Sequence, residues 1–204
     1  MHVDIYKNFD QLARDQRGGI DYCIQRECRD SQVLVIAPHG GGIEPGTSEV
    51  ARALAGEDYS WYCFEGIKNE GNQRLHISSI AFDEKICEAM LKEARLAVVV
   101  HGCEGEQPIV YVGGLQQHLI KATVSALVDA GFTAILDTTY HSGQYPKSLC
   151  NRSASGKGIQ LELSLGLRSM FFASLDRWGR KTTTPSFDLF TGIVQEKIEQ
   201  GFYE

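Results

Sequence analysis

The chain has 204 residues, of which 43% are hydrophobic and 23% charged, a composition typical of one globular domain with a sizeable core. Its formal net charge of −6 argues against non-specific nucleic-acid binding, and no segment approaches the roughly 20 apolar residues that cross a membrane. We therefore expect a single domain over residues 1–204, monomeric, with neither a nucleic acid nor a membrane as partner.

The first residues of the chain lack the charged start and apolar stretch of a secretory signal. The six cysteines are scattered and form no CxxC pair, so we expect mostly reduced thiols, several of them buried. These features predict synthesis in the cytoplasm without a signal peptide, and action outside the cell would then follow lysis.

Apolar runs and helical periodicities alternate along the first half of the chain. Residues 33–37 form a short continuous apolar run, the pattern of a strand that is covered on both faces. Residues 74–79 are compatible with a strand or a loop. The predicted helices lie over 9–16, about 45–55 and onward from Asp83, and the other predicted strands lie over 20–25, 59–65 and 97–100.

The second half of the chain continues this alternation. A predicted helix over 115–130 ends at Gly131, and the polar residues 144–157 are predicted to form a functional loop. The other predicted elements are strands over 108–112, 132–136 and 158–164 and a C-terminal helix over about 186–200. Alternating strands and helices favour an α/β fold, with a mixed, mostly parallel sheet that helices cover on both faces.

Two histidines, His39 and His101, each follow an apolar strand. Because the carboxyl ends of parallel strands meet at one edge of a sheet, we expect both side chains there. Glu44 follows His39 after a glycine loop, and three such ligands with one position left for water are typical of catalytic zinc. A lone histidine of this kind would be better explained by a hydrogen bond to a backbone carbonyl, whereas two at matching strand ends favour a metal. His141 is a rival third ligand.

Glu162 interrupts the apolar strand over 158–164 between two leucines. A hydrolase needs a carboxylate that accepts a proton from the attacking water, and Gln160 and Ser164 share the face of Glu162 by the two-residue period of a strand. The alternative is an alternating strand with one solvated face. Glu162 is therefore the candidate general base.

Cationic side chains gather near the predicted strand ends, and a bidentate arginine suits a substrate carboxylate. Arg152, beside Asn151, is the favoured candidate for substrate binding, and Arg74 is a second. For any single cation, a solvated surface charge is the alternative explanation. His76 is expected to contact substrate rather than metal, whereas His118 lies within a predicted helix and is expected to be a surface or packing residue.

The triple glycine at 40–42 suggests a phosphate-binding loop as another alternative. However, the GxxxxGK[ST] and GxGxxG spacings are both absent, so nucleotide binding is poorly supported. No serine lies in a GxSxG elbow, and a serine nucleophile is unsupported for the same reason.

Residues 37–49, with the sequence APHGGGIEPGTSE, resemble a motif of the phage and Bacillus family of poly-γ-glutamate hydrolases. The stretches RLHISS (74–79), VHG (100–102) and GIQLELS (158–164) support the match, which extends over nearly the whole chain. That family is similar to a compact zinc carboxypeptidase, an α/β sandwich around a mixed sheet. The resemblance implies a zinc-dependent peptidase that cuts the γ-glutamyl amide bonds of poly-γ-glutamate, an anionic polymer of bacterial capsules.

By motif position, the resemblance implies that His39, Glu44 and His101 bind zinc and that Glu162 is the general base. The larger zinc carboxypeptidases place two residues between the first His and Glu, whereas four intervene here, so the geometry of the loop must differ. Two rival functions stay open. One is a zinc amidohydrolase of small acyl-amino acids, of the N-formylglutamate or acylglutamate type, and the other is a non-catalytic binder of anionic polymer.

Overall fold

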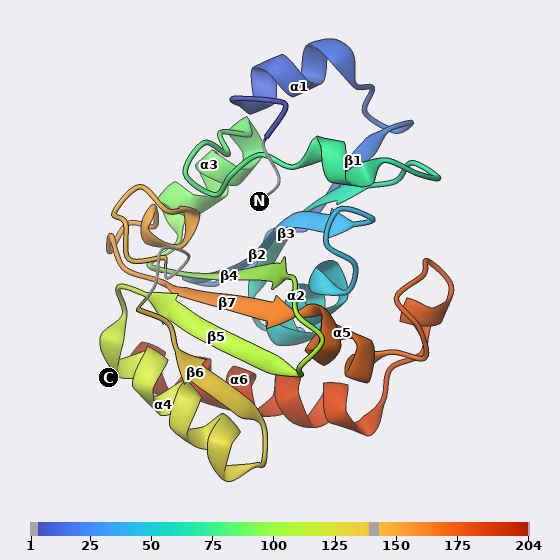
Figure 1. Cartoon of the computed structure of the whole chain (residues 1–204). Coiled ribbons are helices and arrows are strands. Elements are labelled where there is room, and N and C mark those ends of the chain that lie inside the picture. The colour runs from blue at the N-terminus through green and yellow to red at the C-terminus, as the bar shows by residue number, and fades with distance from the viewer. Residues whose placement is uncertain (1–3, 139–142, 204) are drawn as a thin grey trace.

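Seven strands form one sheet in the computed structural model, which describes residues 4–138 and 143–203 (Figure 1). The strands are β1 (Tyr22–Glu27), β2 (Val33–Gly41), β3 (Ser60–Gly66), β4 (Leu96–Cys103), β5 (Ile109–Gly114), β6 (Thr133–Leu136) and β7 (Ile159–Ser164). The α-helices are α1 (Phe9–Asp15), α2 (Thr47–Ala55), α3 (Lys85–Glu93), α4 (Gln117–Asp129), α5 (Leu165–Phe171) and α6 (Pro185–Tyr203). Short 3₁₀ helices span Asn72–Leu75, Leu149–Asn151 and Gly179–Lys181.

The strand order across the sheet is β1-β3-β2-β4-β7-β5-β6. The four strands β3, β2, β4 and β7 run parallel to one another, whereas β1 and β5 pair antiparallel with β3 and β7. The last strand, β6, is parallel to β5. The expected mixed, mostly parallel sheet is confirmed. Because four adjacent parallel strands end at the same edge, residues near the ends of β2, β4 and β7 come together there.

Alternate residues of β2 contribute to two apolar layers, because successive side chains of a strand point to opposite faces. Val33 and Val35 belong to a cluster with buried residues of α2, α4 and α6. Leu34 and Ile36 belong to a second cluster, with buried residues of α1 and α3. Figure 1 shows these two groups of helices on opposite sides of the sheet. Helices cover both faces, as predicted, and all nine residues of β2 are buried.

Several elements differ from the predicted ones. β2 extends to Gly41 because Gly40 and Gly41 continue the pairing with the end of β3. Gly41 has a φ of 64°, and a Cβ there would lie 2.5 Å from the carbonyl oxygen of Gly66, so only glycine fits. The helix that follows begins at Thr47 rather than near 45. Residues 74–79 contain no strand, and α5 was not predicted.

The cysteines agree with the expectation from their scattered positions. All six cysteines lie in the described ranges and are free, and Cys63, Cys87 and Cys150 are buried. Among the helices of the described residues, none has the length and the apolar character that crossing a bilayer requires.

Candidate metal centre

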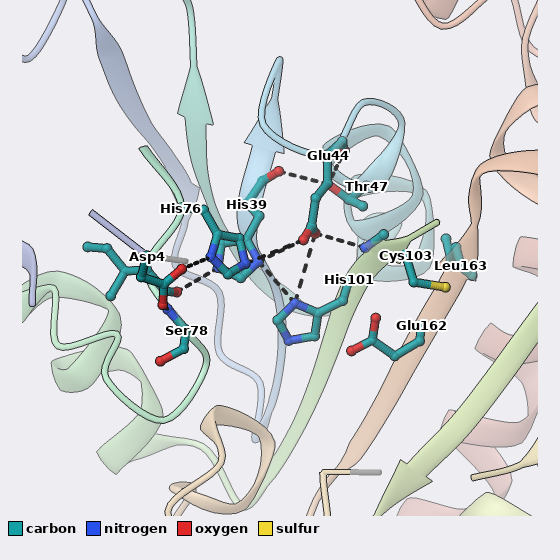
Figure 2. A network of polar contacts seen from close by, with 12 residues as sticks. Asp4, His39, Glu44, Thr47, His76, Ser78, His101, Cys103, Glu162 and Leu163 are labelled. Carbon is teal, nitrogen blue, oxygen red and sulfur yellow. Dashed lines mark hydrogen bonds and ion pairs between the residues drawn. The ribbon is translucent and has the colours of Figure 1, made fainter. Parts of the chain in front are cut away.

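Two histidines face each other from neighbouring central strands. His39 lies near the end of β2 and His101 near the end of β4, and the parallel register of these strands pairs Ile36 with Val99 just upstream. Both side chains are buried, and their Nδ1 atoms lie 3.1 Å apart (Figure 2). The structure therefore brings both predicted histidines to the same edge of the sheet.

Glu44 returns to these histidines because the loop after β2 folds back on itself. The backbone N–H of Glu44 donates to the carbonyl oxygen of His39, at 2.8 Å. The carboxylate then lies with Oε1 3.2 Å from Nδ1 of His39 and Oε2 3.9 Å from Nδ1 of His101. The backbone N–H of Gly102 donates to Oε2 at 2.8 Å and fixes the orientation of the carboxylate. The glycine loop thus serves as a bend that places Glu44.

The hydrogen bond from His39 to a backbone carbonyl determines which ring nitrogen carries the proton in the neutral imidazole. Nε2 lies 2.8 Å from the carbonyl oxygen of Ile77, which only accepts, so Nε2 carries the proton and Nδ1 presents a lone pair. The remote N–H of a metal-binding histidine usually donates to a carboxylate, a backbone carbonyl or a water molecule, and the carbonyl of Ile77 fits this pattern. Three possible ligand atoms, one from each of His39, Glu44 and His101, lie within 4.8 Å of one another. This donor set fits a divalent metal ion such as zinc.

The electrostatics of the cluster match those of a cation site. Burial opposes the charge of Glu44, but His39, His101 and the Gly102 N–H outweigh it and lower the pKa of the carboxyl to about 2. Burial by itself would lower the pKa of His39. The adjacent Glu44 raises this pKa by more than burial lowers it, so the net shift is upward. Without a metal, a proton on the imidazole of His39 therefore stabilises the negative charge of Glu44. A metal ion would replace this proton.

His76 and Asp4 form a pair beside this cluster. The ring of His76 stacks on that of His39 with a centroid distance of 4.0 Å, and its Nε2 lies 3.7 Å from Oε1 of Glu44. Nδ1 of His76 donates to Oδ1 of Asp4 at 2.5 Å, while Oδ2 of Asp4 accepts from the N–H of Ser78 (Figure 2). Sequence reasoning missed Asp4, because no motif connects it with a residue 72 positions later.

Glu162 lies on the strand next to His101. The parallel register of β4 and β7 pairs these two residues directly, and the carboxylate points toward His101 in Figure 2. Nε2 of Gln160 donates to Oε1 of Glu162 at 2.9 Å. Burial, followed by the charges of Glu44 and Asp137, raises the pKa of Glu162 well above its usual value. A carboxyl group with a raised pKa beside a metal centre suits proton transfer.

A sequence model of the poly-gamma-glutamate hydrolase family matches residues 6–193. The chain belongs to this family. It is therefore a hydrolase, and the family expected from residues 37–49 and the three supporting stretches is confirmed.

Relatives of this hydrolase resemble it over nearly its whole length. The UPF0714 protein YndL of Bacillus subtilis (strain 168) is 40% identical over 202 residues, which are 98% of this chain and 79% of YndL. The structure of a bacteriophage poly-gamma-glutamate hydrolase superimposes with a TM-score of 0.95 and 33% identity, covering 98% of this chain and 99% of the other. A zinc-free structure of YndL gives a TM-score of 0.94 and 36% identity, with 98% and 100% covered.

The other predicted site residues of the hydrolase lie outside the His39–Glu44–His101 cluster. Asn151 is buried and donates to the carbonyl oxygens of Gly143 and Tyr145, which closes its own loop. Arg152 donates to the carbonyl oxygens of Ser79 and Phe82 and lies 3.6 Å from the carboxylate of Glu88. Arg74 is exposed on the 3₁₀ helix Asn72–Leu75, and His118 is exposed on α4. His141, the rival ligand, lies outside the described residues.

Proposed function

We propose that this hydrolase is zinc-dependent and cleaves the γ-glutamyl amide bonds of poly-γ-glutamate. The observation that carries the proposal is the convergence of His39, Glu44 and His101 within 4.8 Å, with Glu162 paired to His101 on the next strand. The likeness to the bacteriophage poly-gamma-glutamate hydrolase supports the substrate class. The structure of YndL is described as a zinc-free apo form, which supports zinc as the metal here.

In this proposal, His39, Glu44 and His101 hold the metal. When bound, zinc lowers the pKa of a neighbouring water molecule and polarises the carbonyl group of the amide. The carbonyl oxygen of Ile77 keeps Nδ1 of His39 available by holding the proton on Nε2. The N–H of Gly102 keeps the carboxylate of Glu44 turned toward both histidines.

Glu162 is the general base of the proposed reaction. Its carboxylate accepts the proton of the attacking water and then transfers it to the nitrogen of the leaving amine. Its raised pKa makes the carboxylate a stronger proton acceptor than an ordinary glutamate. Gln160 donates to Oε1, so it fixes the orientation of the carboxylate and leaves Oε2 for the water.

Substrate recognition is assigned to the side chains around this centre. The exposed guanidinium of Arg74 would hold an α-carboxylate of the polymer, and His76 would contact the substrate next to the metal. Asn151 and Arg152 are proposed to act indirectly. Asn151 holds the loop that contains Gly143, Arg152 holds the segment that contains Ser79, and these two stretches would border the substrate. The surface beside the centre would then carry the positive charge of Arg74, in a chain whose net charge is −6.

The experiment is a metal-removal and restoration assay on poly-γ-glutamate. The protein is treated with a chelator, its metal content is measured by elemental analysis, and polymer length is followed by size-exclusion chromatography before and after one equivalent of zinc. We expect shortening of the polymer only with zinc restored. Full activity of the metal-free protein would contradict the proposal.

The same assay separates the two rival functions when a small substrate is included. Turnover of N-formylglutamate without shortening of the polymer would identify a small-molecule amidohydrolase. Binding of the polymer with no turnover and no bound zinc would identify a non-catalytic binder.

A further inference from the structure

Arg168 is a buried cation behind the metal centre. It lies on α5, the helix that directly follows β7, and its side chain is 5% exposed. All three guanidinium nitrogens donate to backbone carbonyls: Nε to Leu163 at 3.1 Å, one terminal nitrogen to Pro45 at 2.8 Å and the other to Cys103 at 3.0 Å. These three acceptors belong to three different segments of the chain.

Each acceptor of Arg168 lies within two residues of a group in the proposed site. Pro45 directly follows Glu44, Leu163 directly follows Glu162, and Cys103 lies two residues after His101. Since the guanidinium is planar and its N–H groups diverge at fixed angles, three simultaneous bonds fix the relative positions of the three segments. A backbone hydrogen bond in a sheet joins only two segments, whereas the side chain of Arg168 joins three.

Gly102 allows Arg168 to approach the centre closely. A Cβ at position 102 would lie 2.8 Å from Cζ of Arg168 and 3.0 Å from Cβ of Glu44, so a side chain there would displace one of them. The N–H of the same residue donates to Glu44. Arg168 and Glu44 therefore both pack against Gly102 at the place where another residue would carry its Cβ.

The charge of Arg168 also has a clear counterpart. Burial lowers the pKa of the guanidinium, and the charges of Glu44, Cys103 and Glu162 act in the opposite direction. An arginine stays protonated at any working pH. It therefore gives a constant positive charge next to the proposed ligand and the proposed base.

From these contacts we infer that Arg168 is a positioning residue, which sets the separation of Glu44, His101 and Glu162 through the backbone carbonyls that follow them. The inference rests on the proposed zinc-dependent function. Arg168 acts through the other residues and not by contact with substrate. Its loss should therefore change metal affinity and kcat, and leave KM nearly unchanged.

The test compares Arg168→Lys with a matched control, Arg29→Lys. Arg29 also donates to two backbone carbonyls, those of Gly56 and Tyr59, but it does so where α2 leads into β3, and its partners adjoin no site residue. In both variants, the zinc dissociation constant is measured by chelator competition, and kcat and KM are measured on poly-γ-glutamate at saturating zinc. Circular dichroism and thermal unfolding of the metal-free proteins report folding.

We expect Arg168→Lys to weaken zinc binding by roughly 10–100-fold, as losses of supporting contacts around metal ligands do. At saturating zinc, kcat should fall by about 100-fold, because the base is displaced, with KM within about twofold of wild type. Arg29→Lys should keep wild-type zinc affinity and kcat. Equal losses in the two variants, or an unchanged zinc affinity and kcat in Arg168→Lys, would overturn the inference.

Arg168→Gln gives a second route if Arg168→Lys does not fold. Its uncharged amide has a single NH2 group and does not donate to three divergent carbonyls at once. Weakened zinc binding and a lower kcat in this variant support the inference, and wild-type values overturn it. A wild-type chain that binds no zinc would overturn both this inference and the proposed function, whereas a failure confined to the variants concerns Arg168 alone.

Discussion

Two groups of side chains meet at the carboxyl edge of the sheet, and they differ in what holds their histidines. We name His39, Glu44 and His101 the inner cluster, and Asp4 and His76 the outer pair. In the inner cluster, a neutral carbonyl, that of Ile77, binds the remote nitrogen of His39. In the outer pair, a carboxylate binds the remote nitrogen of His76.

The two rings stack at 4.0 Å, and their exposure and the groups that they face indicate different tasks. The side chain of His39 is 2% exposed and presents its free nitrogen to a carboxylate and a second imidazole, an arrangement that suits a metal. The side chain of His76 is 29% exposed, and burial followed by the charge of His39 lowers its pKa. We infer that the inner cluster binds the metal, and that the outer pair meets a substrate that arrives from solvent.

The largest effect should come from breaking the inner cluster with His39→Ala. This variant should bind no stoichiometric zinc and should lose polymer cleavage to background, because two ligands do not hold a catalytic zinc. Zinc at 100 times its dissociation constant should raise the free energy of unfolding of the wild type by about 2.7 kcal/mol and leave the variant unchanged. Elemental analysis and thermal unfolding with and without zinc measure this. One retained equivalent of zinc would remove His39 from the ligand set.

Glu162→Gln tests the base separately from the metal. The amide keeps the shape of the side chain but does not accept the proton, so kcat should fall on the order of 10²–10⁴-fold. Zinc content should stay at the wild-type level, since Glu162 is not in the inner cluster. Steady-state kinetics and elemental analysis on the same preparation decide this. Wild-type turnover in the variant would exclude Glu162 as the base.

The pH dependence of zinc binding should follow from the raised pKa of His39. Zinc requires the neutral imidazole, so protons compete with zinc once the pH falls below the pKa of His39. Because Glu44 holds that pKa above its ordinary value, the loss of affinity should begin at a higher pH than for an isolated histidine. Below it, the dissociation constant should rise at least about tenfold per pH unit, because His39 by itself takes up one proton for each ion that it loses. Glu44, with a pKa of about 2, stays ionised throughout this range.

Isothermal titration in buffers of different ionisation enthalpy gives the number of protons released by zinc. A zinc affinity that does not change between pH 8 and pH 5 would contradict this account of His39.

The sequence predicted those features that a local pattern encodes. The apolar run before His39 and the one before His101 predicted two buried strands, and adjacent parallel strands necessarily bring their ends together. The interruption of β7 by Glu162 predicted a polar group at the same edge. Each of these features needs only a few neighbouring residues to be recognised.

The remaining parts of the site depend on contacts between distant segments. Asp4 meets His76 across 72 residues, and Arg168 meets Pro45 across 123 residues. Nothing in the short helix that carries Arg168 distinguishes it from a solvated surface cation. Arg152 was favoured for substrate because of its position before β7, but the structure turns its guanidinium toward the carbonyls of Ser79 and Phe82. Side-chain direction, which periodicity does not give, decides these cases.

Asp4→Asn tests whether the outer pair is independent of the metal. The amide loses the charge that holds Nδ1 of His76, so KM for the polymer should rise several-fold while the zinc dissociation constant stays within about twofold. Unfolding of the variant should cost about 1 kcal/mol less, because this partly exposed pair contributes little more than a surface interaction. Asp10→Asn, an exposed change on α1, is the control. Loss of zinc in Asp4→Asn would show that the outer pair is needed for metal binding and is not independent of the inner cluster.

The smallest effect is expected for Arg74→Gln, which removes an exposed charge two residues before His76. A surface ion pair with a substrate carboxylate is worth about 0.5–1 kcal/mol, so KM for poly-γ-glutamate should rise roughly two- to fivefold with kcat unchanged. Salt should abolish the difference between variant and wild type, because screening at 1 M acts within about 3 Å. Arg14→Gln, on the exposed side of α1, should match the wild type at every salt concentration. If Arg74→Gln instead matches Arg14→Gln at low salt, Arg74 does not bind a carboxylate of the polymer.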